Sequence, residues 1–278
     1  MIAPDRFAAL DDALPVLACP VCSEPFTREA AALRCTSGHA FDVARQGYAA
    51  LATGASVAGD TTAMVADRVA FLAAGHYAAI HDAVAATVPQ EALRVADLAC
   101  GPATYLARVL DAVPAARGVG IDVAAAAARA AARAHPRAAA VTADLRRRYP
   151  LRSGSIDAAL VVFGPRDGVE LARVLAPGGR VTVVVPEEEH LAQLREPFGM
   201  LGVAPDKERR LLERMRPLDV VATEAVREQR VLPPEDVARV VLMGPSGHHL
   251  DAEQVRAEAA ALGPVTVSIA VRVVVFGR

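Results

Sequence analysis

Short apolar runs alternate with amphipathic segments along the chain from residue 93 to residue 186. The short runs predict strands at 93–99, 118–123, 139–145, 156–163 and 180–186. Between them, apolar residues spaced for one face of a helix predict helices at 103–113, 124–136 and 168–179. This alternation is typical of an α/β fold in which helices cover both faces of a doubly wound, mostly parallel sheet. Residues 266–278 alternate in polarity and predict a terminal antiparallel strand.

Residues 63–88 predict a helix that breaks at Gly75, because apolar positions recur every three or four residues on either side of that glycine. The preceding segment, 51–62, is small, polar and rich in glycine, which is typical of a linker. We therefore divide the chain into an N-terminal module at 1–50, a linker at 51–62 and an α/β domain at 63–278.

The composition supports a packed core and narrows the kinds of partner. Of the 278 residues, 53% are hydrophobic and 22% are charged, which argues against global disorder. The net charge of −2 is unlike that of a protein that binds nucleic acid over its whole surface, so an RNA site would be a local patch. No apolar run reaches the roughly 18 residues that span a bilayer. The N-terminus also lacks the uninterrupted apolar stretch of a secretory signal. We expect a cytoplasmic protein without a membrane partner.

Three of the four cysteines lie near the N-terminus with the spacing of a zinc site. Cys19 and Cys22 form a close pair, and Cys35 is followed by His39, which gives C-x2-C-x12-C-x3-H. Two ligands on each of two turns can converge on Zn²⁺, which accepts three thiolates and one imidazole. Four protein ligands leave no position for water, so the predicted site is structural. The alternative is three buried free cysteines beside an unrelated histidine.

A second motif follows the first predicted strand of the α/β domain. The loop from Asp97 to Ala103 stands beyond the carboxyl end of that strand, where doubly wound folds bind their ligands. It contains one glycine, Gly101, whereas a dinucleotide fingerprint has three, so a pyrophosphate would be poorly held. S-adenosylmethionine has no phosphate, and its methionine end needs only a closely approaching turn of small residues. The loop therefore favours S-adenosylmethionine as the cofactor, and we interpret Cys100 as a packing residue.

Carboxylates stand at the ends of three successive predicted strands, at Asp97, Asp122 and Asp144. Asp122 follows the second strand, where a carboxylate suits two ribose hydroxyls. Asp144 could accept a hydrogen bond from an adenine amino group. The three acids together form a more specific signal than the single glycine. The alternative is that each carboxylate caps the helix after it, a position that aspartate favours.

In combination, these motifs resemble the RlmA family of 23S rRNA (guanine-N1)-methyltransferases, including its macrolide-resistance branch. The resemblance covers almost the whole chain. The segments that carry it are the zinc motif, Gly38 to Asp42, Arg45 to Tyr48, Gly59-Asp60, Arg68 to Tyr77, Asp97 to Pro102, Phe163 to Arg166 and Val185 to Leu191. It implies a Rossmann-like class I methyltransferase with a seven-stranded sheet, a homodimer, and a zinc module that grips an rRNA hairpin.

The resemblance also implies roles for single residues. It assigns cofactor contacts to Tyr77, Gly101, Pro102 and His190, and it places Phe163, Pro165 and Arg166 against the target base. The loop departs from the family pattern at two positions, because Ala99 and Ala103 stand where the family more often has glycine.

The implied reaction moves a methyl group to guanine N1, whose proton must leave, and Asp144 and Asp167 are our candidates to accept that proton. Local basic clusters suited to phosphates lie at Arg146-Arg147-Arg148 with Arg152 and at Lys207-Glu208-Arg209-Arg210, although each could equally be solvated surface. Two other functions stay open. One is a methyltransferase for a small natural product, which would not need a zinc module. The other is a non-catalytic zinc-ribbon adaptor that binds RNA, against which the retained loop residues argue.

Overall fold

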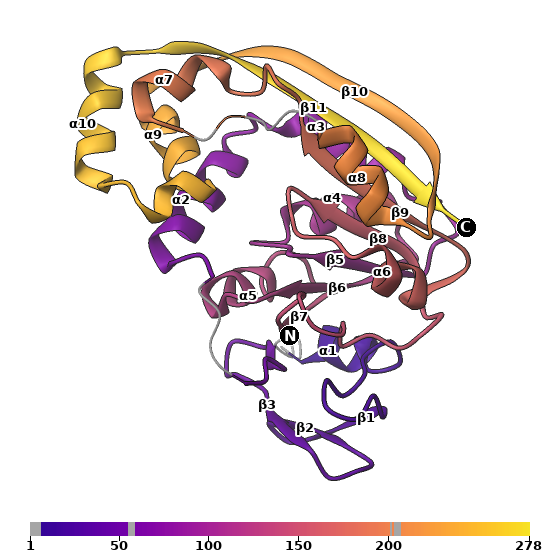
Figure 1. The fold of residues 1–278 in the computed structure, drawn as a ribbon. Coiled ribbons are helices and arrows are strands. Elements are labelled where there is room, and N and C mark those ends of the chain that lie inside the picture. Colours follow the sequence, from indigo (N-terminus) through magenta and orange to yellow (C-terminus); the bar gives the residue numbers. More distant parts are fainter. Residues whose placement is uncertain (1–6, 55–58, 201, 203–206) are drawn as a thin grey trace.

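The computed structural model describes residues 7–54, 59–200, 202 and 207–278, and its main element is a large sheet (Figure 1). The strands of this sheet are β4 (Ala49–Ala50), β5 (Arg94–Leu98), β6 (Arg117–Asp122), β7 (Ala138–Thr142), β8 (Ile156–Val162), β9 (Leu175–Pro186), β10 (Asp219–Leu232) and β11 (Val265–Gly277). Their spatial order is β10-β11-β9-β8-β5-β6-β7-β4. Neighbours from β9 to β4 run parallel, whereas β11 runs antiparallel to β9 and β10. The predicted doubly wound, mostly parallel fold is confirmed.

The sheet has eight strands, one more than the seven implied by the family resemblance. The strands from β5 to β11 are the seven of the α/β domain. The eighth, β4, arrives from the N-terminal segment and pairs with the free edge of β7 through Ala49 and Val141. A two-residue strand leaves no periodic signal in a sequence, which is why the pattern did not reveal it.

The order of the strands creates a crevice beside β5. The chain builds β5, β6 and β7 in one direction across the sheet and then returns to place β8 on the other side of β5. At such a reversal the connections after neighbouring strands leave in opposite directions, which opens a space at the carboxyl ends of the strands. The carboxyl ends of β5 and β8 therefore define the place where a ligand can enter.

Helices cover both faces of the sheet with separate apolar layers. One layer contains side chains from α3 (Ala78–Ala86), α4 (Thr104–Ala112) and α9 (Pro234–Leu242), and the other from α1 (Ala8–Ala13), α6 (Gly168–Val174) and α8 (Lys207–Met215). Alternate residues of β5 divide between the layers, with Val95 in the first and Ala96 in the second. This division explains why the strands read as continuous apolar runs.

The N-terminal segment packs on the second face. It contains a small antiparallel sheet of β1 (Phe26–Glu29), β2 (Ala32–Cys35) and β3 (Ala40–Asp42). Buried side chains of this segment, such as Leu17 and Leu33, share one apolar cluster with Val119 and Val141 of the large sheet. The module therefore completes its core against the α/β domain, as expected of a segment too small to bury one alone. The domain boundary at residue 50 stays a prediction, and residues 55–58 of the expected linker lie outside the described chain.

The ends of three predicted elements differ from the structure. The helix expected at 124–136 is α5 (Ala125–Ala131), since the chain must turn early to bring β7 into parallel register with β6. The strand expected at 139–145 ends at Thr142, which places Asp144 in the loop that follows. The helix expected at 168–179 ends at Val174, because Leu175 already pairs with Ile156 of β8.

The segment from 187 to 264, for which we predicted no helix or strand, contributes part of the wall opposite the strand ends. It contains η1 (Ala192–Leu194), α7 (Arg195–Phe198), α8, β10, α9, η2 (Pro245–His248) and α10 (Ala252–Leu262). α9 packs against α2 (Thr62–Ala73) and against α10. Figure 1 shows α2, α9 and α10 grouped together to one side of the sheet.

The predicted break at Gly75 is confirmed. α2 ends at Ala73 and α3 begins at Ala78, with an angle of 83° between them and a left-handed φ of +79° at Gly75. A glycine suits this turn because other residues pay a steric penalty there. Among the helices of the described chain, no single one is long and apolar enough to cross a membrane, and the α2–α3 pair passes that test only jointly.

Candidate functional site

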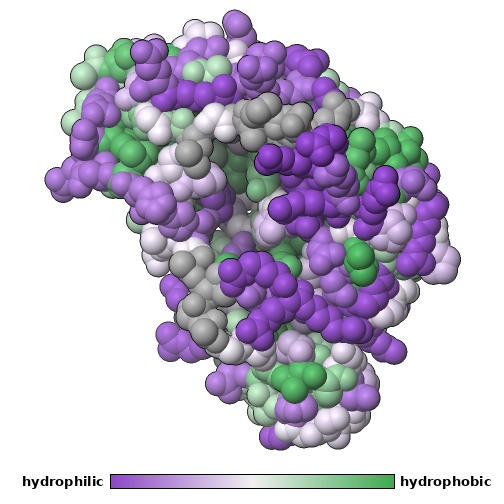
Figure 2. Space-filling model, in the orientation of Figure 1, coloured by the Kyte–Doolittle hydropathy of each residue, from purple (hydrophilic) through white to green (hydrophobic). Residues whose placement is uncertain are grey.

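A cavity of about 920 Å³ opens at the carboxyl ends of β5, β6 and β8, with α2 and the α9–η2 turn on its other side. Figure 2 shows a hollow in this face of the molecule, bordered mainly by hydrophilic surface. All of the residues predicted to contact cofactor or base line the cavity, namely Tyr77, Asp97, Gly101, Pro102, Asp122, Asp144, Phe163, Pro165, Arg166 and His190. Residues separated by more than a hundred positions thus meet in one space.

The loop after β5 turns through three left-handed residues. Ala99, Gly101 and Ala103 have φ values of 58°, 53° and 57°. A left-handed conformation costs a non-glycine residue about 1–2 kcal/mol, and strain of this kind concentrates at functional sites. The two alanines therefore hold the backbone shape that glycine would adopt freely. Alanine in place of glycine at positions 99 and 103 therefore adds backbone strain to the loop and leaves the loop in its left-handed conformation.

Asp122 ties this loop to the end of β6. Its Oδ2 accepts a hydrogen bond from the Gly101 N–H at 2.9 Å, and its Oδ1 accepts one from the Ala124 N–H at 2.9 Å. The N-cap of α5 is Ala124, so Asp122 is not a helix cap. Each carboxylate oxygen has a second lone pair. Asp122 can therefore still accept hydrogen bonds from a ligand in the cavity.

Asp97 is the most deeply buried carboxylate in the cavity wall. Its side chain is 1% exposed, and its Oδ2 has no hydrogen-bond partner among the described residues. Burial, reinforced by the nearby charge of Asp122, raises the pKa of Asp97 to about 7. A buried, unpaired oxygen of this kind is suited to a donor that arrives with a ligand, above all a cationic one.

The two candidates for accepting the proton, Asp144 and Asp167, differ in whether they line the cavity. Asp144 lines the cavity, and both of its oxygens accept hydrogen bonds from the Arg146 guanidinium at 3.0 Å. This pairing with Arg146 lowers the pKa of Asp144. Asp167 is not among the residues that line the cavity, and its predicted role stays untested. Its Oδ1 caps α6 by accepting hydrogen bonds from the N–H groups of Val169 and Glu170.

Tyr77 and His190 meet across the cavity wall. The Tyr77 hydroxyl lies 3.0 Å from His190 Nε2, and His190 Nδ1 accepts a hydrogen bond from the Ala270 N–H. In a neutral imidazole the proton is then on Nε2, which donates to the tyrosine oxygen. Tyr77 keeps its own hydroxyl hydrogen for another acceptor. Burial raises the pKa of Tyr77 above its usual range, so the hydroxyl stays protonated.

The break before α3 is anchored from α9. His76 Nε2 lies 2.8 Å from the Asp236 carboxylate, which also pairs with Arg239 at 2.8 Å. Phe71 packs edge-on against the Tyr77 ring, with centroids 5.0 Å apart. These contacts from two sides fix the direction in which Tyr77 enters the cavity.

The segment after β8 presents an exposed aromatic ring to the cavity. Phe163 is 41% exposed, has a left-handed φ of 57°, and lies with its ring centroid 5.9 Å from that of His190. Arg166, from the same segment, has a buried Nε without a hydrogen-bond partner in the described part of the chain. Burial and the nearby charge of Arg214 lower the pKa of Arg166. Arg166 is therefore a partly desolvated cation on the cavity wall.

Several lining residues had no role in the sequence-based prediction. Arg68 of α2 lies against Gly101, and Met243 and His248 approach from the α9–η2 turn. Arg195, Arg210 and Arg214 line the side of the cavity nearest α7 and α8. Arg210 belongs to a predicted basic cluster, whose Lys207 and Glu208 side chains lie outside the described part. Nothing in their local sequence distinguishes these arginines from surface residues.

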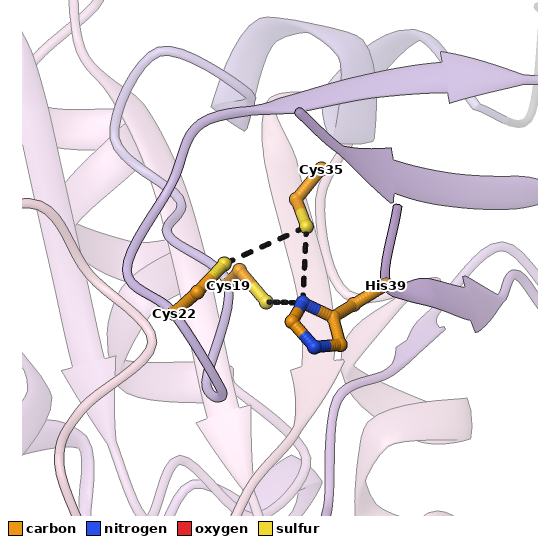
Figure 3. Close-up of side chains that lie close together, drawn as sticks. All are labelled: Cys19, Cys22, Cys35 and His39. Carbon is orange, nitrogen blue, oxygen red and sulfur yellow. Dashed lines mark hydrogen bonds between the residues drawn. The ribbon is translucent and has the colours of Figure 1, made fainter. Parts of the chain in front are cut away.

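The four predicted metal ligands converge in the N-terminal module (Figure 3). The Cys22 and Cys35 sulfurs lie 3.6 Å apart, and His39 Nδ1 lies 3.3 Å from Cys35 Sγ and 3.7 Å from Cys19 Sγ. Tetrahedral Zn²⁺ with Zn–S bonds of about 2.3 Å would separate two sulfurs by about 3.8 Å. The donors thus have the spacing of a tetrahedral site. The Glu24 N–H lowers the pKa of Cys22 to about 6, which favours the thiolate.

Comparison with known proteins agrees with this geometry. A protein-family model described as "RlmA, N-terminal", a zinc ribbon, matches residues 17–52. A second family model, described as a methyltransferase domain, matches residues 95–179. A Streptomyces fradiae protein named 23S rRNA (guanine(748)-N(1))-methyltransferase is 41% identical, with 91% of this chain and 94% of the relative covered. A Micromonospora griseorubida protein named "Putative 23S rRNA (guanine-N(1)-)-methyltransferase" is 43% identical, with 94% of this chain and 97% of the relative covered. The chain belongs to the family of 23S rRNA (guanine-N1)-methyltransferases.

A solved structure agrees on the fold of this family member. A chain from the complex of the Haloferax volcanii Trm112 methyltransferase activator with a methyltransferase matches with a TM-score of 0.52 and 21% identity. The match covers 80% of the present chain and 98% of the other. At this identity the likeness supports the fold alone.

We expect replacement of Asp97 with asparagine to stabilise the ligand-free methyltransferase at pH 8. In the folded protein the pKa of Asp97 is about 7, whereas the usual value is 3.8. Between about pH 4 and pH 7 the folded protein therefore keeps a proton on Asp97 that the unfolded chain has already lost. Wild-type stability should fall as the pH rises through this window, by at most about 4 kcal/mol. Urea unfolding at pH 5 and pH 8 measures it. The same pH dependence in both proteins would contradict the raised pKa.

Proposed function

We propose that this protein transfers a methyl group from S-adenosylmethionine to N1 of a guanine in a 23S rRNA hairpin. The observation that carries the proposal is the cavity itself, in which the carboxylates at the ends of β5, β6 and the β7 loop meet the small-residue loop at Gly101. The names of the relatives, which share 41–43% of their residues with this chain, supply the substrate class. S-adenosylmethionine, when bound, supplies an electrophilic methyl group on its sulfonium.

The residues on the strand ends fit the three parts of this cofactor. The unpaired Oδ2 of Asp97 is suited to the ammonium of the methionine end. Asp122 retains acceptor capacity for the ribose hydroxyls. Asp144, with its lowered pKa, is suited to accept a hydrogen bond from the adenine amino group more than to remove a proton. Tyr77, Gly101, Pro102 and His190 complete the proposed contacts.

The opposite wall fits a base that is presented from a hairpin. The half-exposed ring of Phe163 offers a stacking face, and Pro165 and Arg166 stand beside it. Arg166 can donate to the carbonyl and ring nitrogen acceptors of guanine. The residues orient the base and exclude water, and this positioning is the main contribution that an enzyme makes to methyl transfer. Of our two candidates for the N1 proton, only Asp144 lines the cavity.

The direct test is methyl transfer to RNA. We expect the purified protein to transfer radiolabel from S-adenosylmethionine to unmodified 23S rRNA and to create one strong primer-extension stop, because a methyl on N1 blocks Watson–Crick pairing. Asp122→Ala should lower transfer by about 100-fold, since it releases the loop that positions the cofactor. Label without a stop would move the modification to another atom. Cofactor binding without RNA labelling would favour a small-molecule acceptor, and no cofactor binding would favour an adaptor.

Basic residues extend from the cavity towards the zinc module. Arg146 lines the cavity, and the Arg147 guanidinium lies 3.1 Å from where a Cβ of Gly54 would stand, at the exit from the module. Arg210 and Arg214 border the cavity from α8. We propose that the flanks of the target hairpin follow these arginines, since phosphate contacts position RNA without reading its sequence.

Removal of two of these charges should weaken RNA binding in a salt-dependent way. We expect Arg210→Ala combined with Arg214→Ala to reduce affinity for an rRNA hairpin and to reduce the slope of log affinity against log salt by about 1.5. Filter binding between 50 mM and 200 mM salt measures the slope. Arg209→Ala on the same helix is the matched control, because Arg209 lies outside the cavity wall and pairs with Glu213. An unchanged slope would remove α8 from the RNA site.

We propose that the Cys19, Cys22, Cys35 and His39 cluster holds a structural Zn²⁺ and shapes an RNA-recognition module. All four ligand atoms lie within 4.8 Å of one another, and the module's core is continuous with the domain. We expect one zinc per chain by elemental analysis and loss of zinc in Cys35→Ser, with Cys100→Ser as the control that retains it. The zinc-free variant should lose RNA affinity and retain affinity for S-adenosylmethionine. Full zinc in Cys35→Ser would contradict this ligand set.

The remaining expectations follow from the substrate and the family. Ribosomal RNA is made and assembled in the bacterial cytoplasm, which is where we propose that the enzyme acts. The homodimer and a contribution to macrolide resistance stay predictions that rest on the family resemblance.

A further inference from the structure

Arg68 is the cation that lies against the cofactor loop. It projects from α2 into the cavity with a side chain that is 25% exposed. A Cβ placed on Gly101 would lie 3.3 Å from Arg68 Nη1 and 3.5 Å from its Cδ. The guanidinium therefore rests over the turn of the loop, and the missing side chain at Gly101 leaves room for it.

Two anchors hold the guanidinium in place. Nη1 donates to the Asp60 carboxylate, and Nη2 donates to the Met243 carbonyl oxygen at 2.5 Å. A guanidinium has five N–H donors. Among the described residues, the structure records no partner for the other three. Arg68 is thus oriented in advance by the α9–η2 turn and by the segment before α2, with donor capacity left for a ligand.

The charges around the loop are complementary to an amino acid. Asp97 offers an unpaired, buried carboxylate oxygen, which suits an ammonium. Arg68 opposes the rise in the pKa values of Tyr77 and Asp122 that burial produces, so its charge reaches both sides of the loop. An α-amino acid presents an ammonium and a carboxylate on the same carbon. The acid and the base on the cavity wall match these two groups.

Two other arginines of the cavity wall have recorded partners away from the loop. Arg146 forms a two-pronged pair with Asp144 beyond β7, and Arg195 donates to the carbonyl oxygens of Glu188 and His190. Burial and the nearby charge of Arg214, on α8, lower the pKa of Arg166. In the described cavity wall, Arg68 is the arginine with a recorded contact at the Gly101 turn.

We infer that Arg68 binds the α-carboxylate of the methionine end of S-adenosylmethionine. The inference rests on the proposed cofactor and assigns to Arg68 a part in its recognition. A guanidinium donates two parallel hydrogen bonds to a carboxylate, which gives direction as well as attraction. The contact would set how far the methionine end enters, and through it where the sulfonium lies relative to the base.

The test compares two ligands that differ only in this carboxylate. Calorimetric titration of the full-length protein with S-adenosylmethionine and with its decarboxylated analogue gives dissociation constants without any need for catalysis. We expect Arg68→Met to weaken binding of S-adenosylmethionine by about 10- to 100-fold and to leave binding of the analogue nearly unchanged. Arg68→Lys should fall between these limits, because it keeps the charge and loses the paired geometry. Retained binding of the analogue also shows that the cavity is folded.

Three results would overturn the inference. Equal losses for both ligands would mean that Arg68 only supports the loop, and Asp60→Asn should then produce the same pattern. Unchanged binding of S-adenosylmethionine by Arg68→Met would exclude the contact. Failure of the wild-type protein to bind S-adenosylmethionine would reject the proposed function as well, whereas the first two results would leave that function standing.

Discussion

The hydrogen bond from the Gly101 N–H to the Asp122 carboxylate is the interaction on which the site depends. It joins the loop after β5 to the end of the neighbouring parallel strand, so the two halves of the ligand crevice keep a fixed separation. The loop reaches this bond only by passing through left-handed residues at Ala99, Gly101 and Ala103. The strain of that path is balanced by the register of the sheet around it, since β5 pairs on both sides with parallel strands.

The same crevice contains two buried carboxylates, whose charged forms are destabilised by burial. Asp97 and Asp122 are buried near each other, and burial raises both pKa values. A protein selected only for stability would not keep a carboxylate oxygen at 1% exposure without a partner in the described part of the chain. A ligand with a positive charge and several hydrogen-bond donors would offset this destabilisation and would explain why the carboxylates are there. Arg68, anchored on the other side of Gly101, supplies a positive charge for the carboxylate of such a ligand.

The N-terminal module and the α/β domain are one structure held together by apolar contacts. β4 extends the large sheet, and the buried residues around Cys19 and Cys35 belong to the cluster that lies under β6 and β7. The cluster of Cys19, Cys22, Cys35 and His39 therefore has a fixed position relative to the cavity. The arginines after β7 lie between the two, where an RNA that contacts both would pass.

The sequence by itself determined the parts whose signals are local. Close spacing identified Cys19, Cys22, Cys35 and His39, because metal ligands must sit on short turns. Alternating apolar segments identified the strands, and their ends marked Asp97, Asp122 and Asp144. Family motifs added Tyr77, His190 and the segment after β8, which the residues alone would have left as packing and capping.

Only the tertiary structure decided between residues whose local signals are alike. Asp144 and Asp167 both follow strands, yet Asp167 caps a helix and Asp144 faces the cavity, since capping depends on where the next helix begins. In the sequence, Arg68 is an ordinary polar position of an amphipathic helix. In the structure, α2 bends away from α3 at Gly75, and Arg68 lies against the loop at Gly101. We predicted no element between 187 and 264. β10 gives a weak pattern because it is largely exposed along its length, whereas α9 is amphipathic and buries Val237, Val240 and Val241. Contacts between distant segments carry this information, and no short stretch of sequence contains it.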